Sequence, residues 1–176
     1  FIYKIIKSNK FDETIKKIKK EYIIDCSFVV VPDTLHYQIG NACLKNNLHT
    51  MIVKPVATKT SHVKELLKIS KKNNLYCIVE FHKRFDRQNI ILKDYYNEKK
   101  LGDVLYTFTE YSQKKIIPTK IFKRWIETTN LIQYLGVHYI DLIRFITGGM
   151  PSKVSAVGQK NFLIKKKINA NDSIQL

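Results

Sequence analysis

The sequence of 176 residues contains only six glycines, and none of them belongs to a G-x-G-x-x-G pattern between a strand and a helix. Such a turn normally holds the pyrophosphate of a dinucleotide against the backbone amides at a helix N-terminus. The 176 residues taken alone are therefore expected to bind a dinucleotide weakly or not at all.

Cysteine and long apolar runs are also scarce. Cys26, Cys43 and Cys77 lie in apolar segments without C-x-x-C spacing, which predicts reduced core residues in a cytoplasmic protein and no metal site. No apolar run reaches the roughly 18 residues of a transmembrane candidate, and no signal-peptide pattern is present, so no membrane partner is expected.

Arginine is the rarer cation in a strongly basic chain. The formal net charge is +16, from 31 basic and 15 acidic residues, but the only arginines are Arg84, Arg87, Arg124 and Arg144. Recognition of bases and phosphates favours the arginine fork, and the lysines are spread along the whole chain. Nucleic acid is therefore an unlikely partner. A basic nucleic-acid-binding module stays as a less favoured alternative, and it predicts binding that weakens steeply with salt.

The strongest structural pattern lies between residues 25 and 57. An apolar run over residues 26–31 ends at Pro32 and predicts a strand buried on both faces. Helical spacing follows as far as Asn46, and a second apolar run covers residues 50–53. A strand, a helix and a strand within about 30 residues predict a βαβ unit of a parallel sheet, in which ligands bind beyond the carboxyl ends of the strands.

Similar patterns extend this unit in both directions. Residues 1–6 predict a short strand, residues 11–22 and 60–72 predict helices, and residues 75–81 predict a further buried strand. We therefore predict an α/β fold whose first domain, residues 1–85, is the C-terminal half of a Rossmann-like parallel sheet domain.

The pattern changes in the remaining residues, 86–176. Residues 104–111 alternate with a period of two, which predicts a half-buried strand of an open-faced sheet. A helix is predicted over residues 131–147, because Gly148 and Gly149 follow it, and a strand is predicted over residues 153–160. These elements predict the start of a second, α+β sheet domain.

Four groups of residues carry a resemblance to a known family. Pro32-Asp33 with His36 follows the first strand, Lys54-Pro55 follows the second, Arg84 lies in the segment HKRFD, and His138 and Asp141 lie in GVHYIDLIRFITGG. In this order they resemble the glucose-fructose oxidoreductase, inositol dehydrogenase and MocA family (Gfo/Idh/MocA). Two positions depart from its pattern: Val53 replaces the glutamate of Glu-Lys-Pro, and Tyr134 replaces an aspartate that often precedes the histidine.

The resemblance implies an NAD- or NADP-dependent oxidoreductase that moves a hydride at a hydroxyl or carbonyl of a sugar, cyclitol or sugar nucleotide. It implies that Lys54 exchanges the proton of the substrate oxygen, that His138 orients the substrate or passes the proton on, and that Tyr134 assists. It also implies cofactor contacts by Pro32, Asp33, His36, Lys54 and Pro55. Substrate contacts are implied for Arg84, Asp141 and His138. Trp125 is a further candidate for a substrate contact, because an aromatic ring beside the cations of residues 123 and 124 suits a sugar or a phosphate.

The resemblance further implies a homo-oligomer formed through the sheet of the second domain. Because the chain begins with Phe1 and lacks the glycine turn, we expect the native protein to extend beyond both Phe1 and Leu176. Val53, Tyr134 and the missing glycine turn also fit a non-catalytic or degenerate family member, which predicts no cofactor binding.

Each candidate residue also has a structural alternative. Arg84 can pair with Asp86 or with a helix carbonyl, and Trp125 can anchor a loop. His138 can be a core residue, and Lys54 can be a solvated lysine at a strand end.

Overall fold

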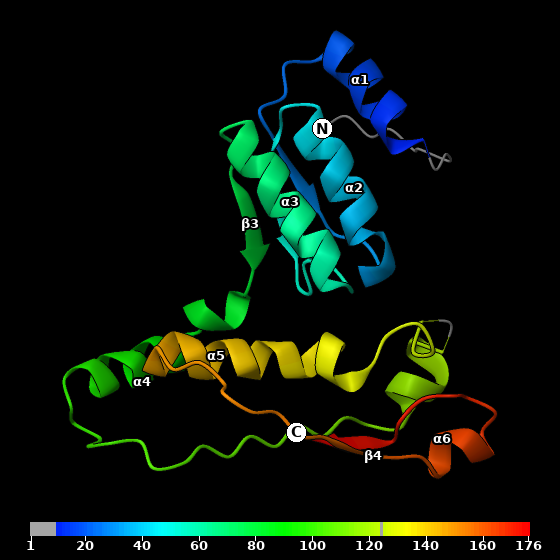
Figure 1. The fold of residues 1–176 in the computed structure, drawn as a ribbon. Helices are drawn as coiled ribbons and strands as arrows, with labels where there is room; N and C mark the ends of the chain where they lie inside the picture. Colours follow the sequence, from blue (N-terminus) through cyan, green and yellow to red (C-terminus); the bar gives the residue numbers. More distant parts are fainter. Residues whose placement is uncertain (1–9, 124) are drawn as a thin grey trace. The chain divides into compact units, whose positions relative to one another are not determined.

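The computed structural model describes residues 10–123 and 125–176 (Figure 1). The chain divides into two compact units, Phe1–Glu80 and Phe81–Leu176. The strand predicted over residues 1–6 lies outside the described residues. The predicted domains, 1–85 and 86–176, stay a prediction, and the compact units divide after Glu80.

The first unit confirms the predicted alternation of strands and helices. Three parallel strands form one sheet in the order β1-β2-β3, and this arrangement confirms the α/β class. The elements are α1 (Phe11–Glu21), β1 (Cys26–Val29), α2 (Asp33–Lys45), β2 (His49–Val53), α3 (Thr60–Lys72) and β3 (Cys77–Glu80).

The two faces of this sheet differ in burial. Val29 and Ile52 are paired in the ladder, and both are buried with Leu44 of α2 in one apolar cluster. Phe28 and Ile78 point to the opposite face and are 70% and 47% exposed. The prediction that the first strand is buried on both faces is therefore wrong for the described residues, because alternate side chains leave a strand on opposite faces and α2 and α3 cover only one (Figure 1).

Gly40 allows α2 to approach this sheet closely. A Cβ atom at Gly40 would lie 2.6 Å from Cδ1 of Ile52 and 3.6 Å from Leu66. Gly40→Val is expected to lower the free energy of unfolding by about 1–3 kcal/mol, because the core would be overpacked. Chemical denaturation followed by circular dichroism measures this change, and Gln38→Val on the exposed side of α2 controls for helix propensity. Equal losses in the two variants would contradict the prediction.

The second unit is built mainly from helices. The helix predicted over residues 131–147 forms as a π-helical turn followed by α5, and it ends at Gly148, whose φ of 70° lies in the left-handed region. The elements are η1 (His82–Phe85), α4 (Arg87–Asn97), η2 (Ile117–Ile121), η3 (Ile132–Gly136), α5 (Val137–Thr147), β4 (Val157–Gln159), α6 (Phe162–Lys165) and β5 (Ser173–Gln175).

The half-buried strand predicted over residues 104–111 does not form. This segment has no strand partner among the described residues, and Leu105, Tyr106 and Phe108 are each more than 80% exposed. Alternation of side chains predicts which residues share a face, but a strand also needs a neighbouring backbone for its hydrogen bonds. The sheet of this unit is instead the antiparallel pair β4–β5, which confirms a strand within residues 153–160.

Candidate active site

The carboxyl ends of the three parallel strands bring together several residues that the sequence singled out. Pro32 and Asp33 begin α2 just after β1, Lys54 and Pro55 follow β2, and Glu80 is the last residue of β3. Because parallel strands end at the same edge of a sheet, these residues share the edge where ligands bind in such folds. Asp33 is only 2% exposed.

Lys54 is half-buried at this edge. Burial lowers the pKa of Lys54 below the ordinary value for lysine, while the nearby carboxylates of Glu80 and Asp33 act in the opposite direction and raise it. The peptide bond between Lys54 and Pro55 is cis. A partly desolvated lysine of this kind can lose its proton closer to neutral pH than a solvated one, which suits acid–base chemistry.

His36 lies under the same edge with its ring 1% exposed. Its Nδ1 atom is 2.5 Å from the carbonyl oxygen of Pro55, and its Nε2 atom is 2.8 Å from the carbonyl oxygen of Val31. Both ring nitrogens thus meet backbone carbonyls. The contact with a cofactor that the sequence implied for His36 stays a prediction, as do those of Pro32, Asp33, Lys54 and Pro55.

Glu80 is a candidate that the sequence analysis missed, because it was included in the apolar run over residues 75–81. In the ladder between β2 and β3, Glu80 pairs with Val53, the residue that directly precedes Lys54. Its charge acts on Lys54. An acidic residue at the last position of an otherwise apolar strand is the signal that could have identified it, since a carboxylate is rarely placed in a buried strand without a partner.

In the second unit, Arg84 and Asp141 form a bidentate ion pair. The Nε atom of Arg84 donates to Oδ2 of Asp141 at 2.7 Å, and its Nη2 atom donates to Oδ1 at 2.5 Å. The alternative partner suggested for Arg84, Asp86, is wrong, since Asp86 lies 4.0 Å from Lys83 instead. The pair joins η1 to α5, so a substrate would have to reach Arg84 through Nη1 or displace Asp141.

His138 lies one turn before Asp141 on α5 and is 4% exposed. The rings of His82 and His138 meet edge-on with their centroids 4.5 Å apart, and the Phe81 ring also faces His138 edge-on, with a centroid distance of 6.3 Å. The guanidinium of Arg84 lies over the ring of Phe81 at 5.2 Å. Phe81 and His82 thus pack against the His138 ring, and Arg84 packs against Phe81.

Tyr134 and Trp125 belong to one aromatic cluster. Their ring centroids are 4.6 Å apart, and both rings also contact Phe122 edge-on. Burial, together with nearby Tyr111, raises the pKa of the Tyr134 hydroxyl above its ordinary value. At neutral pH Tyr134 therefore keeps its proton and can act as a hydrogen-bond donor. Its predicted catalytic role, and the predicted contact of Trp125 with substrate, stay predictions.

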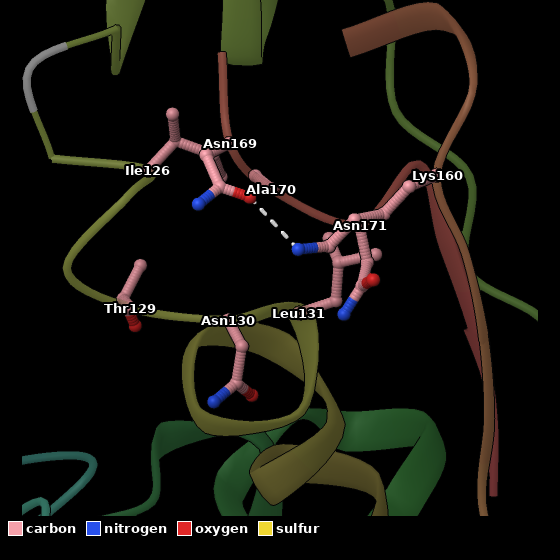
Figure 2. Close-up of a pocket in the computed structure, with 8 residues that line it drawn as sticks. All are labelled: Ile126, Thr129, Asn130, Leu131, Lys160, Asn169, Ala170 and Asn171. Carbon is pink, nitrogen blue, oxygen red and sulfur yellow. Dashed lines mark hydrogen bonds between the residues drawn. The ribbon is translucent and has the colours of Figure 1, made fainter. Parts of the chain in front are cut away.

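The described residues of the second unit line hollows of different size. One of about 320 Å³ lies beside Trp125 and is lined by Lys120, Ile121, Phe122, Lys123 and Trp125. The other, of about 90 Å³, contains none of the predicted residues, and in it Lys160 donates a hydrogen bond to Asn169 (Figure 2). It is lined by Ile126, Thr129, Asn130, Leu131, Lys160, Asn169, Ala170 and Asn171.

Two further properties bear on the class of protein. Within the described residues, no three histidine, cysteine or acidic side chains are grouped so that they could hold a metal ion. The same residues include no helix with the length and apolar character needed to cross a membrane.

Comparison with protein families decides the relationship. Residues 5–81 match the model of the oxidoreductase family with an NAD-binding Rossmann fold, and residues 91–175 match the model of the GFO/IDH/MocA C-terminal domain. The chain belongs to the Gfo/Idh/MocA family. The resemblance found in the sequence is thereby confirmed, and the two matches together cover most of the chain.

Several Gfo/Idh/MocA proteins are similar to the chain in sequence. An uncharacterized oxidoreductase of Streptococcus pneumoniae is 26% identical over 136 residues, which are 77% of this chain and 37% of the relative. The scyllo-inositol 2-dehydrogenase (NADP(+)) of Bacillus subtilis is 24% identical over 146 residues, which are 81% of this chain and 40% of the relative. The chain thus spans about two fifths of the length of these curated relatives.

Solved structures of the Gfo/Idh/MocA family share the fold. The myo-inositol 2-dehydrogenase of Lactobacillus plantarum matches with a TM-score of 0.76 at 22% identity, over 90% of this chain and 48% of that one. The scyllo-inositol dehydrogenase of Lactobacillus casei, solved with bound NAD(H) and scyllo-inositol, matches with a TM-score of 0.73 at 22% identity. This match covers 94% of this chain and 48% of that one. These matches establish the Rossmann-like fold of the family for this chain.

Proposed function

We propose that this protein is an NAD(P)-dependent oxidoreductase that transfers a hydride between a nicotinamide and a hydroxyl-bearing carbon of a cyclitol or sugar. The observation that carries the proposal is Lys54, a half-buried lysine whose pKa is lowered by burial, at the carboxyl edge of a parallel sheet in a chain of this family. The comparisons give no support to a degenerate member or to a nucleic-acid-binding module.

The residues at this edge fit the nicotinamide end of the cofactor. Pro32, Asp33 and Pro55 flank Lys54 at the ends of β1 and β2, where they would hold the ring, and the cofactor when bound would supply the hydride acceptor. The six glycines form no turn for the pyrophosphate, so the fit within these 176 residues concerns the nicotinamide end.

The protein's own part in the reaction is proton transfer and orientation. Oxidation of an alcohol carbon leaves an oxygen that has to lose its proton, and the neutral amine of Lys54 accepts it. In the reverse direction the Lys54 ammonium returns the proton. His138 orients the substrate oxygen or passes the proton on, and Tyr134 assists as a hydrogen-bond donor.

The proposed substrate class is a ring with several hydroxyl groups. The names of the B. subtilis and L. casei relatives concern scyllo-inositol, and the L. plantarum structure is a myo-inositol dehydrogenase. Trp125 and the Arg84–Asp141 pair are the candidate contacts of the second unit. We also expect a homo-oligomer formed through the sheet of that unit.

A coenzyme-reduction assay tests the proposal. The purified natural protein is mixed with NAD⁺ or NADP⁺ and with a panel of inositols, aldoses and polyols, and nicotinamide reduction is followed by absorbance. We expect reduction of at least one coenzyme with a ring polyol, and a loss of that rate in Lys54→Met. A folded natural protein that reduces neither coenzyme with any member of the panel would refute the proposal.

A further inference from the structure

His36 connects the two segments that frame the proposed active site. It is the fourth residue of α2, and its ring is 1% exposed beneath the carboxyl edge of the sheet. Through one nitrogen it meets the carbonyl oxygen of Val31, after β1, at 2.8 Å, and through the other the carbonyl oxygen of Pro55, after β2, at 2.5 Å. One side chain therefore bridges the two strand ends.

The segment reached by this bridge has little regular structure of its own. Residues 54–59 connect β2 to α3 without forming helix or strand, so its path depends on side-chain contacts. Pro55 is buried, and Val56 packs against the apolar cluster of the first unit. The carbonyl of Pro55 belongs to the residue directly after Lys54, so a contact there fixes the backbone that carries the amine.

We propose that His36 is a positioning residue: its imidazole anchors the Pro55 carbonyl to the end of β1 and thereby sets where Lys54 leaves the sheet. Each ring nitrogen lies within hydrogen-bond distance of a backbone carbonyl oxygen, to which it donates when it carries the ring proton. The residue is also shielded from solvent, so neither nitrogen is accessible to a bound ligand. The link from this anchor to catalysis rests on the proposed function of Lys54.

Two substitutions at His36 separate the hydrogen bonds from the volume of the ring. His36→Phe keeps an aromatic ring but donates no hydrogen bond, whereas His36→Gln keeps an amide donor that can serve one carbonyl. His62→Phe is the matched control, because His62 also lies in the first unit, on α3. Its ring stacks on the ring of Tyr37 with the centroids 3.8 Å apart.

In coenzyme-reduction kinetics we expect His36→Phe to lower kcat about 10–100-fold with the KM for NAD(P)⁺ changed less than about 3-fold, because a small displacement of a catalytic group costs rate rather than binding. His36→Gln should recover part of the lost kcat, and His62→Phe should retain the wild-type value. A raised coenzyme KM with unchanged kcat would instead identify His36 as a cofactor contact and overturn the proposal.

Nuclear magnetic resonance tests the anchor without any activity. In the natural protein and in His62→Phe, the amide and methyl signals of Val56 should be single and sharp. In His36→Phe, provided that the remaining signals show a folded chain, the Val56 signals should broaden or divide. Unchanged Val56 signals would refute the anchor even in an active enzyme. If the natural protein reduces no coenzyme, the proposed function fails while this measurement still decides the role of His36.

Discussion

Replacing Lys54 with methionine is expected to lower the rate of coenzyme reduction by about 10²–10⁴-fold, the range that a positioned acid–base group contributes. Methionine preserves the length and apolar stem of lysine but cannot exchange a proton. Because Lys54 is half-buried, methionine also fits its surroundings, and the chain should fold normally. Steady-state kinetics with NAD(P)⁺ and a ring polyol measure the effect.

The pH dependence of the rate provides a second test of Lys54. The neutral amine is the form that accepts a proton, so the rate of alcohol oxidation should rise with pH and level off above the pKa of Lys54. Since burial lowers that pKa, the rise should occur below the range of a solvated lysine. The Glu80 carboxylate raises the pKa of Lys54, so Glu80→Gln should move the rise to lower pH.

Lys59→Met is the matched control for Lys54→Met. Lys59 precedes α3 in the same connection between β2 and α3, but its side chain is exposed. Its loss should leave both the rate and the pH profile unchanged. If Lys54→Met retained more than about a tenth of the wild-type rate, Lys54 could not be the proton acceptor, because an acid–base group contributes at least about 10²-fold.

Breaking the Arg84–Asp141 pair is expected to lower the free energy of unfolding of the second unit by about 2 kcal/mol. Hydrogen bonds between charged groups contribute about 1.5–3 kcal/mol, and the 38% exposure of the Arg84 side chain favours the lower part of this range. Asp141→Asn removes the carboxylate charge, and Arg84→Lys removes the two-pronged geometry while it keeps the positive charge.

Trp125 makes this measurement specific to the second unit. It is the only tryptophan of the chain and packs in the aromatic cluster with Tyr134 and Phe122, so its fluorescence during denaturation reports on that unit. The double variant should lose less than the sum of the two single losses, because the two residues share one interaction. Additive losses would show that the pair contributes no coupling energy.

An exposed ion pair provides the control for the Arg84–Asp141 pair. The Nζ atom of Lys100 lies 2.5 Å from Oε2 of Glu98, but the two side chains are 57% and 54% exposed. Pairs in such surroundings contribute little, so Glu98→Gln should leave the fluorescence-detected transition unchanged. The contrast between the two pairs would show that the partial burial of Asp141, whose side chain is 11% exposed, gives the Arg84 contact its strength.

The sequence by itself determined the order and type of the elements in the first unit. Apolar runs, helical spacing and the stops near Asn46 act between residues close in the chain, so the strands and helices of residues 26–80 could be predicted. The end of α5 at Gly148 could be predicted for the same reason, because a glycine that adopts the left-handed conformation commonly ends a helix. Lys54 could be placed at the carboxyl edge for the same reason.

Only the tertiary structure decided which residues meet across long separations. Arg84 pairs with Asp141 rather than with its neighbour Asp86, and no periodicity specifies a contact 57 residues away. His36 lies on the buried side of α2, and the helical spacing does not indicate that its ring bridges two strand ends. Residues 104–111 alternate like a strand but lack a partner among the described residues. Local sequence sets the conformational preference of a segment, whereas pairing and burial depend on which surfaces the folded chain brings together.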